Sequence, residues 1–131
     1  MLFLPKNINK VIVPPIKCQG IKTKLVRFIA QSIEWNGKGR WVEPFLGSGV
    51  VAFNISPAKA LLTDTNKHII EVYRQIQKGK INRHTISEAL FEMGGQLEKN
   101  GEEYYYEIRK RFNQKNSSID FIFLNSVSTL V

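Results

Sequence analysis

The stretch Trp41-Val42-Glu43-Pro44-Phe45-Leu46-Gly47-Ser48-Gly49 decides how the rest of the chain is interpreted. Residues 40–45 are predicted to form a short buried strand, and the two glycines permit a tight turn with positive backbone angles. The apolar run Val50 to Phe53 then begins a helix. Because free N–H groups at a helix start point into the preceding turn, this pattern predicts a cradle for a nucleotide-like ligand. A Gly-x-Gly turn is also common where no ligand binds.

A second predicted strand, residues 58–64, ends in an acid. Asp64 lies 21 residues beyond Glu43, near the spacing of about 20 residues at which nucleotide-binding units place a ribose-binding acid. A carboxylate suits this role because its two oxygens can accept hydrogen bonds from two vicinal hydroxyls. Asp64 could instead cap the next helix, although Thr65 and Asn66 can cap it themselves. We predict the ribose role.

A helix is also predicted before the first strand. Its apolar face comprises Leu25, Phe28, Ile29 and Ile33. Lys22 stands at the start of this helix, where the helix dipole disfavours a cation, so a ligand carboxylate would account for it. A solvated lysine is the alternative. Further upstream, residues 7–13 are predicted to be β-leaning up to Pro14-Pro15.

The second half of the chain is predicted to be helical. Amphipathic patterns cover residues 68–77, 85–97 and 102–112, and Gly94-Gly95 is expected to bend or end the second of these helices. Residues 119–125 are strongly apolar, with nothing after them to pack against. With two or three strands in all, the chain is predicted to be the front part of a larger α/β domain, because a parallel sheet needs both faces covered.

Composition narrows the class of protein. The 131 residues make one domain, with ordinary hydrophobic (43%) and charged (23%) content. No apolar run approaches the roughly 18–20 residues that span a bilayer, so no membrane segment is expected. The single cysteine, Cys18, excludes an internal disulfide and suits the cytoplasm. No metal site is expected, because no further ligands are spaced suitably around His68.

The net charge of +8 is concentrated at one end of the chain. Residues 1–40 hold eight Lys or Arg and one acid, for +7, whereas residues 41–131 hold eleven Lys or Arg and ten acids, for +1. A clustered basic face favours a polyanion, most commonly nucleic acid. A solvated basic surface explains the same charge.

Three motifs in this order resemble the Dam-type adenine-N6 DNA methyltransferases, most closely those of restriction–modification systems. They are Lys17-Cys18-Gln19-Gly20-Ile21-Lys22, the stretch Glu43 to Gly49, and Asp64-Thr65-Asn66. The resemblance extends over about residues 11–125. It implies the N-terminal part of a Rossmann-like methyltransferase fold, followed by the helical start of the target-recognition region. The expected division is residues 1–76 for S-adenosylmethionine and residues 77–131 for the beginning of the DNA-binding part.

The resemblance also implies a cofactor, a partner and site residues. The cofactor is S-adenosylmethionine, the partner is duplex DNA, and the reaction is methyl transfer to adenine N6. Lys22 would contact the methionine portion and Asp64 the ribose, while Cys18 stands where many members have tryptophan. The residues matched to the cofactor site are Cys18, Lys22, Glu43, Phe45, Gly47, Gly49 and Asp64.

The sequence departs from the family at the catalytic motif. Members carry Asp-Pro-Pro-Tyr or a close variant, which holds the flipped adenine. Neither aspartate of this chain begins such a motif, because Asp64 precedes Thr65 and Asp120 precedes Phe121. Residues 126–131 also leave the family pattern. We therefore expect a truncated or frame-shifted reading frame and no methylation by the chain alone.

Two other classes of protein remain open from the residues. A non-catalytic nucleic-acid-binding module would place phosphates on Lys17, Lys22, Lys24 and Arg27. A nucleotide-binding oxidoreductase would use the same glycine turn and Asp64, with Ala52 where the dinucleotide fingerprint has its third glycine or an alanine.

Overall fold

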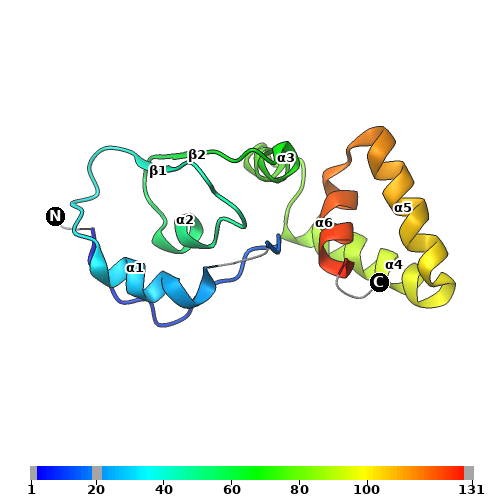
Figure 1. Cartoon of the computed structure of the whole chain (residues 1–131), viewed down its shortest axis with the longest axis horizontal. Helices are drawn as coiled ribbons and strands as arrows, with labels where there is room; N and C mark the ends of the chain where they lie inside the picture. Colours follow the sequence, from blue (N-terminus) through cyan, green and yellow to red (C-terminus); the bar gives the residue numbers. More distant parts are fainter. Residues whose placement is uncertain (1–2, 19–21, 129–131) are drawn as a thin grey trace. The chain divides into compact units, whose positions relative to one another are not determined.

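The computed structural model describes residues 3–18 and 22–128 (Figure 1). The elements, in order, are η1 (Thr23–Leu25), α1 (Val26–Ser32), β1 (Trp41–Glu43), α2 (Val50–Ile55), β2 (Ala60–Leu62), α3 (Lys67–Gln77), α4 (Arg83–Asn100), α5 (Glu102–Lys115) and α6 (Ser118–Val127). Over the described residues, β1 and β2 form a two-stranded parallel sheet. The chain forms two compact units, Met1–Thr65 (unit 1) and Asn66–Val131 (unit 2).

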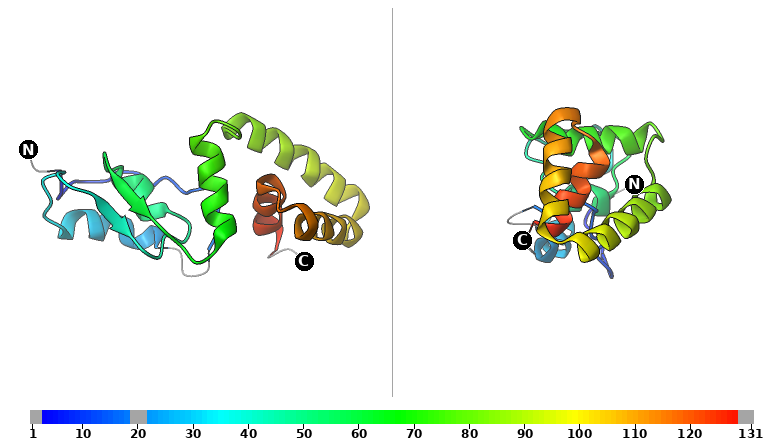
Figure 2. Two further views of the ribbon diagram at one scale, coloured as in Figure 1. Left: turned by 90° about the horizontal axis from the view of Figure 1, so that it is seen from above. Right: turned by 90° about the vertical axis from the view of Figure 1, so that its right-hand side faces the viewer.

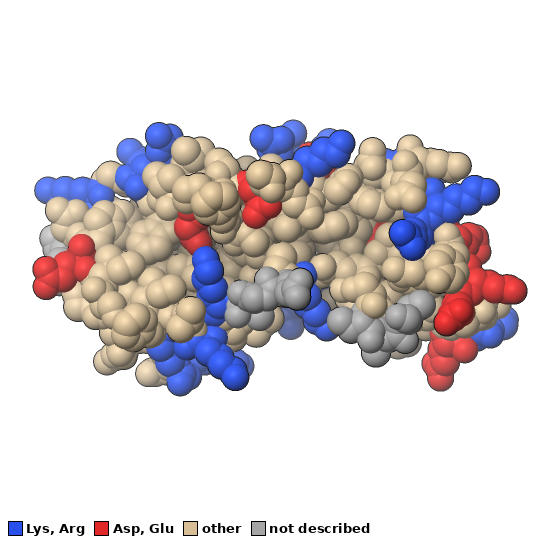
Figure 3. Space-filling model, in the orientation of Figure 1, with Lys and Arg blue, Asp and Glu red and all other residues tan. Residues whose placement is uncertain are grey.

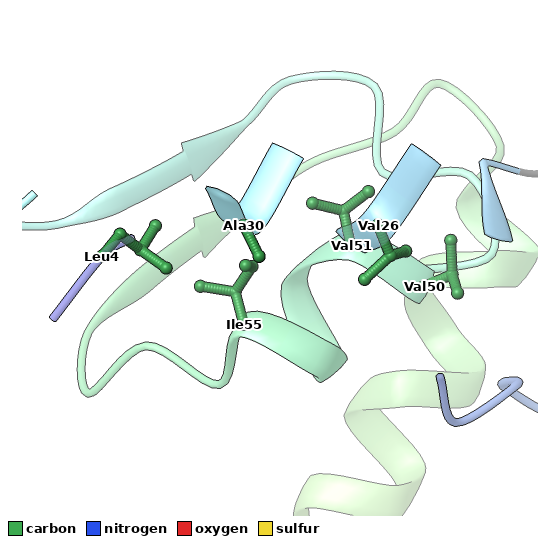
Figure 4. Close-up of a cluster of buried hydrophobic side chains, with 6 residues drawn as sticks. All are labelled: Leu4, Val26, Ala30, Val50, Val51 and Ile55. Atoms are coloured by element: carbon green, nitrogen blue, oxygen red, sulfur yellow. The ribbon is translucent and has the colours of Figure 1, made fainter. Parts of the chain in front are cut away.

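Unit 1 mixes helices with the small parallel sheet. Side chains from α1, α2 and the N-terminal segment point toward one another in a buried cluster (Figure 4) of Leu4, Val26, Ala30, Val50, Val51 and Ile55. Trp41 of β1 packs against this cluster, so the sheet turns that face to the core. The strand, turn and helix predicted from residues 40–53 are therefore present, in a mixed α/β arrangement.

The first strand is shorter and more exposed than predicted. β1 covers Trp41–Glu43, and Val42 keeps 52% of its surface exposed. Val42 stands opposite Leu61 of β2, which is 41% exposed. Because successive side chains of a strand face opposite sides, these two share the face away from Trp41, which the described residues leave uncovered. The prediction of a buried strand was wrong on that face.

The first helix is present, and its apolar face was predicted in part: Ile29 and Ile33 pack against the core cluster. Val26 and Ala30 are fully buried, whereas Leu25 and Phe28 are 50% and 67% exposed. Leu25 belongs to η1, so the helical register that buries a side chain begins at Val26. Val26 and Ala30 are four residues apart, so their side chains lie on one face of α1. That face packs against α2.

Residues 7–13 form no strand, contrary to prediction. Instead, the side chain of Asn54 holds this segment: its Oδ1 accepts from the N–H of Ile12, and its Nδ2 donates to the carbonyl of Ile12, both at 2.8 Å. One amide side chain thus supplies the donor and acceptor that a neighbouring strand would supply.

Over its described residues, 66–128, unit 2 forms the helices α3 to α6 (Figure 2). Helices α4, α5 and α6 meet around a buried cluster of Met93, Ile108, Phe123 and Val127, and α3 packs against α6. Ile69 and Val72 of α3 are buried, as the predicted stripe of that helix requires. The functional division at residues 76 and 77 stays a prediction.

Gly94-Gly95 does not end its helix early, and the apolar residues 119–125 find packing partners earlier in the chain. Helix α4 continues through Gly94-Gly95 to Asn100, because packing of Met93 into the core outweighs the low helix propensity of two glycines. Residues 119–125 lie within α6 and are covered by α3, α4 and α5, which precede them in the chain. An apolar segment buried on most sides shows no clear helical period.

An ion pair ties α5 to α6. Asp120 is 2% exposed, and its two carboxylate oxygens accept from Nε and Nη2 of Arg111 at 2.8 and 2.5 Å. This two-point contact is the geometry in which a guanidinium best matches a carboxylate. Hydrogen bonding to Asp120 raises the pKa of Arg111 above its usual value.

Candidate functional site

The carboxyl ends of β1 and β2 meet at one edge of the sheet. Glu43 stands opposite Leu62 in the register, and the hydrogen bonding continues beyond both strands. The N–H of Thr63 donates to the carbonyl of Glu43, and the N–H of Leu46 donates to the carbonyl of Thr63, both at 2.9 Å. Parallel pairing therefore brings Glu43 and the residues after Leu62 to the same edge, where open α/β sheets bind ligands.

The turn after β1 depends on its two glycines. Gly47 has φ +59° and Gly49 has φ +83°, in the region that other residues rarely adopt. Gly49 is the N-cap of α2, and a Cβ on Gly49 would overlap the ring of Phe53. The turn thus requires glycine at position 49 on two grounds, its positive φ and the space that Phe53 occupies.

Asp64 is tied to this turn. Its Oδ2 accepts a hydrogen bond of 2.9 Å from the N–H of Gly47. The cap of α3 is instead Asn66, whose side chain accepts from the N–H of His68 at 3.0 Å. The alternative role of Asp64 as the cap of α3 is therefore wrong, and the carboxylate lies against the glycine turn.

A cavity of about 220 Å³ lies between these elements. Six of the seven predicted site residues line it, namely Cys18, Lys22, Glu43, Phe45, Gly47 and Asp64. Gly49 does not line the cavity but forms the N-cap of α2 beside it. Of the motif at residues 17–22, residues 19–21, including Gly20, lie outside the described residues.

The cavity changes the acidity of two groups that line it. Burial raises the pKa of Glu43, against the opposing effects of a hydrogen bond from Trp41 Nε1 (3.0 Å) and the charge of Lys22. Burial, together with the negative charge of Asp64, raises the pKa of the Cys18 thiol. Cys18 is therefore less reactive at neutral pH than a free cysteine.

The lining offers complementary groups to a polar ligand. Lys22 supplies a cation, Glu43 and Asp64 supply carboxylate acceptors, and Phe45, which is 78% exposed, supplies an aromatic face. Among the described residues, no group of three or more His, Cys, Asp or Glu side chains could hold a metal ion. The donors and acceptors suit an organic ligand with both charges and hydroxyls.

Sequence reasoning missed several contributors. Leu46, Ser48, Val50 and Val51 also line the cavity. Trp41 was missed as the hydrogen-bond donor to Glu43, although two residues apart on a strand share one face. Of the two aromatic residues near the turn, Phe45 is exposed and lines the cavity. Trp41 is half-buried and packs against the core cluster.

The four basic residues proposed for a nucleic-acid-binding module, Lys17, Lys22, Lys24 and Arg27, are exposed. Lys22 lines the cavity, and Arg27 donates from Nη2 to the carbonyl of Asn9.

His68 packs against the rings of Phe112 and Phe121, with ring centroids 4.8 and 5.6 Å from that of His68. In the part of the chain that the structure describes, no helix has the length and apolarity to cross a membrane.

Three relatives resemble this chain over most of its length. A type II methyltransferase of Lactococcus lactis subsp. cremoris, M1.LlaDCHI, is 32% identical over 102 residues, 77% of this chain and 34% of that protein. The type II methyltransferase M.MjaIII of Methanocaldococcus jannaschii is 28% identical over 130 aligned positions, 86% of this chain and 44% of that protein. A DNA N-6-adenine-methyltransferase of Escherichia phage P1 is 28% identical over 111 residues, 81% of this chain and 13% of that protein.

The chain thus spans less than half the length of each of these relatives. No solved structure matches it significantly. The match to a family extends from residue 19 to residue 129, which includes the glycine turn, Asp64 and all four helices of unit 2. On that match the chain belongs to the D12 class N6 adenine-specific DNA methyltransferase family.

Proposed function

We propose that this chain is the S-adenosylmethionine-binding part of a site-specific adenine-N6 DNA methyltransferase of a restriction–modification system. The observation that carries the proposal is the cavity at the glycine turn, where Lys22, Glu43 and Asp64 meet. A Rossmann-like sheet, of which β1 and β2 are two strands, belongs to the same proposal. We also propose that residues 1–76 bind the cofactor and that residues 77–131 begin the DNA-binding part. The partner would be duplex DNA, and the protein would act in the cytoplasm.

Asp64 is proposed to hold the ribose. The N–H of Gly47 already orients one carboxylate oxygen through a 2.9 Å hydrogen bond. The two oxygens of a carboxylate offer about four acceptor positions, and two vicinal ribose hydroxyls would present two donors to them. The contact with Gly47 thus fixes the side chain before the ligand binds, which lowers the entropy lost on binding.

Lys22 and the glycine turn are proposed to hold the methionine portion. The ammonium of Lys22 would pair with the ligand carboxylate, and the turn at Gly47 and Gly49 would let the backbone approach closely. The cavity of about 220 Å³ is smaller than the roughly 300–1,000 Å³ of complete ligand sites, so it fits part of the cofactor. When bound, S-adenosylmethionine supplies an activated methyl group.

The 131 residues are expected to transfer no methyl group by themselves. The sequence holds no Asp-Pro-Pro-Tyr motif, and the family resemblance assigns the flipped adenine to that motif. The measurement is incorporation of radiolabelled methyl groups into adenine-containing duplex DNA. Incorporation above background by the purified chain would contradict this expectation.

Cys18 provides a direct test of cofactor binding, because it is the only cysteine and lines the cavity. Its raised pKa predicts slow alkylation by iodoacetamide at pH 7. The rate should still increase with pH at values where the rate of a free thiol has levelled off. Saturating S-adenosylhomocysteine is expected to slow the reaction about tenfold by covering the thiol. Intact-mass spectrometry of the full chain measures both rates.

A nicotinamide dinucleotide serves as the control ligand in that experiment. It is expected to leave the alkylation rate of Cys18 unchanged. Protection by the dinucleotide and not by S-adenosylhomocysteine would favour the oxidoreductase class instead. No protection by either ligand, with DNA binding that ignores both, would favour a nucleic-acid-binding module.

A further inference from the structure

Four exposed cations cluster where α3 leads into α4. Residues 74–83 contain Arg74, Lys78, Lys80 and Arg83 and no Asp or Glu, and all four cationic residues are exposed. We call these four residues the basic corner. Their net charge of +4 lies within a ten-residue segment of a unit whose 66 residues otherwise carry more acids than bases.

The backbone of the basic corner is fixed at both ends. The N–H of Lys78 donates to the carbonyl of Arg74 at 2.9 Å, and Gly79 takes φ +72° to end α3. Helix α4 then begins with a capping box in which Asn82 and Thr85 bond to each other's backbone. The spacing of the cations is therefore set by the fold, which lowers the entropy lost when a partner binds.

Among the described residues, the cations of the basic corner lack acidic partners. The ion pairs of His84 with Glu88 and of Arg111 with Asp120 involve none of these four cations. The helix dipole favours Arg74 and Lys78 at the end of α3 but disfavours Arg83, the first residue of α4. Local stability thus accounts for two of the four charges and not for Arg83.

The opposite end of unit 2 is acidic. Residues 88–107 hold six glutamates and one lysine, Lys99. Figure 3 shows red side chains gathered where α4 and α5 meet, while blue side chains project above α3. Charge within the unit is therefore separated between its two ends, as electrostatic orientation of a polyanion requires.

We propose that the basic corner binds the phosphate backbone of duplex DNA. This inference rests on the proposed function, since the DNA partner comes from it, and adds the surface of unit 2 that contacts that partner. Lysine and arginine side chains that neutralise phosphates release counterions, so the affinity falls as salt rises. The contact is independent of base sequence, because phosphates carry no sequence information directly.

The test compares variants of the full chain by fluorescence anisotropy with labelled duplex DNA over a range of salt concentrations. The double variant Lys78→Gln, Lys80→Gln is expected to bind roughly tenfold more weakly at low salt. The slope of log affinity against log salt should fall in magnitude by about two, one for each lost phosphate contact. Both losses should be equal for two duplexes of unrelated sequence.

The matched control is Lys59→Gln, Lys99→Gln, which removes the same charge at exposed positions outside the basic corner. It should keep the wild-type slope, and Lys78→Arg, Lys80→Arg should keep both slope and affinity. Equal losses in the corner and control variants, or no DNA binding by the wild-type chain at low salt, would overturn the inference. Cysteine protection by S-adenosylhomocysteine is measured separately, so the cofactor proposal stands or falls independently.

Discussion

Replacing Asp64 with asparagine will lower the affinity for S-adenosylhomocysteine by about 100-fold or more. Two hydroxyl hydrogen bonds to a carboxylate contribute about 1.5–3 kcal/mol each, and about 1.4 kcal/mol corresponds to a tenfold change. Asparagine keeps one acceptor oxygen for the N–H of Gly47 but replaces the other oxygen by a donor. Titration calorimetry on the full chain, with the melting temperature as a second readout, measures the loss.

Two further variants separate binding from folding. Asp64→Ala removes the acceptor for Gly47 as well, so it should lose both affinity and about 1 kcal/mol of unfolding free energy. Thr63→Val, at the preceding position, removes a 2.9 Å hydrogen bond to the carbonyl of Pro44 but does not line the cavity. Its affinity should stay within about threefold of wild type; an equal loss in Thr63→Val would show that Asp64 acts only on the turn.

Replacing Arg111 with methionine will destabilise unit 2 by about 3–5 kcal/mol. The substitution leaves the carboxylate of Asp120, which is 2% exposed, without its two-point partner. An uncompensated buried charge costs this much because water cannot replace the lost guanidinium. Urea unfolding at neutral pH, monitored by helical circular dichroism, measures the change.

The double variant Arg111→Met, Asp120→Asn provides the control. Asparagine removes the charge that lost its partner, so the pair should recover more than half of the lost free energy. Asp120→Asn alone should cost less than Arg111→Met, because Arg111 keeps 47% of its side chain exposed to solvent. If the double variant were as unstable as the sum of the single changes, charge burial would not explain the effect.

The glycine turn and most of the helices were predictable because neighbouring residues in the sequence determine them. The glycine turn between β1 and α2 follows from two positions that require positive φ, and α3 follows from a clear apolar stripe. The buried sides were less predictable. Val42 was expected inside because strand residues of this type usually are, but burial depends on what covers the sheet.

The failures in unit 2 have a similar origin. Helix α6 is covered by three helices, so residues 119–125 are apolar on most sides. A helix that is apolar on most sides lacks the 3.6-residue spacing of apolar positions by which helices are identified in a sequence. The glycines at 94 and 95 weaken α4 locally, yet tertiary packing of Met93 decides the outcome. Neither effect is visible in a window of a dozen residues.

The candidate site was largely predictable. The spacing after Glu43 pointed to Asp64, and the family resemblance pointed to the other site residues. In the structure, parallel pairing brings the ends of both strands to one edge. The hydrogen bond between Gly47 and Asp64 was not predictable, because it depends on the exact turn geometry. The shift in the acidity of Cys18 likewise depends on burial by residues distant in sequence.

The side chain of Asn54 that holds Ile12, and the bond from Lys6 to the carbonyl of Ile55, close separations of 42 and 49 residues in unit 1. Helices α4, α5 and α6 of unit 2 are joined by only Gly101 and by the pair Asn116-Ser117. Chains whose contacts are local fold faster than chains that must close long loops. Helices α4, α5 and α6 are therefore expected to assemble before unit 1 closes its long loops and before α3 packs against α6.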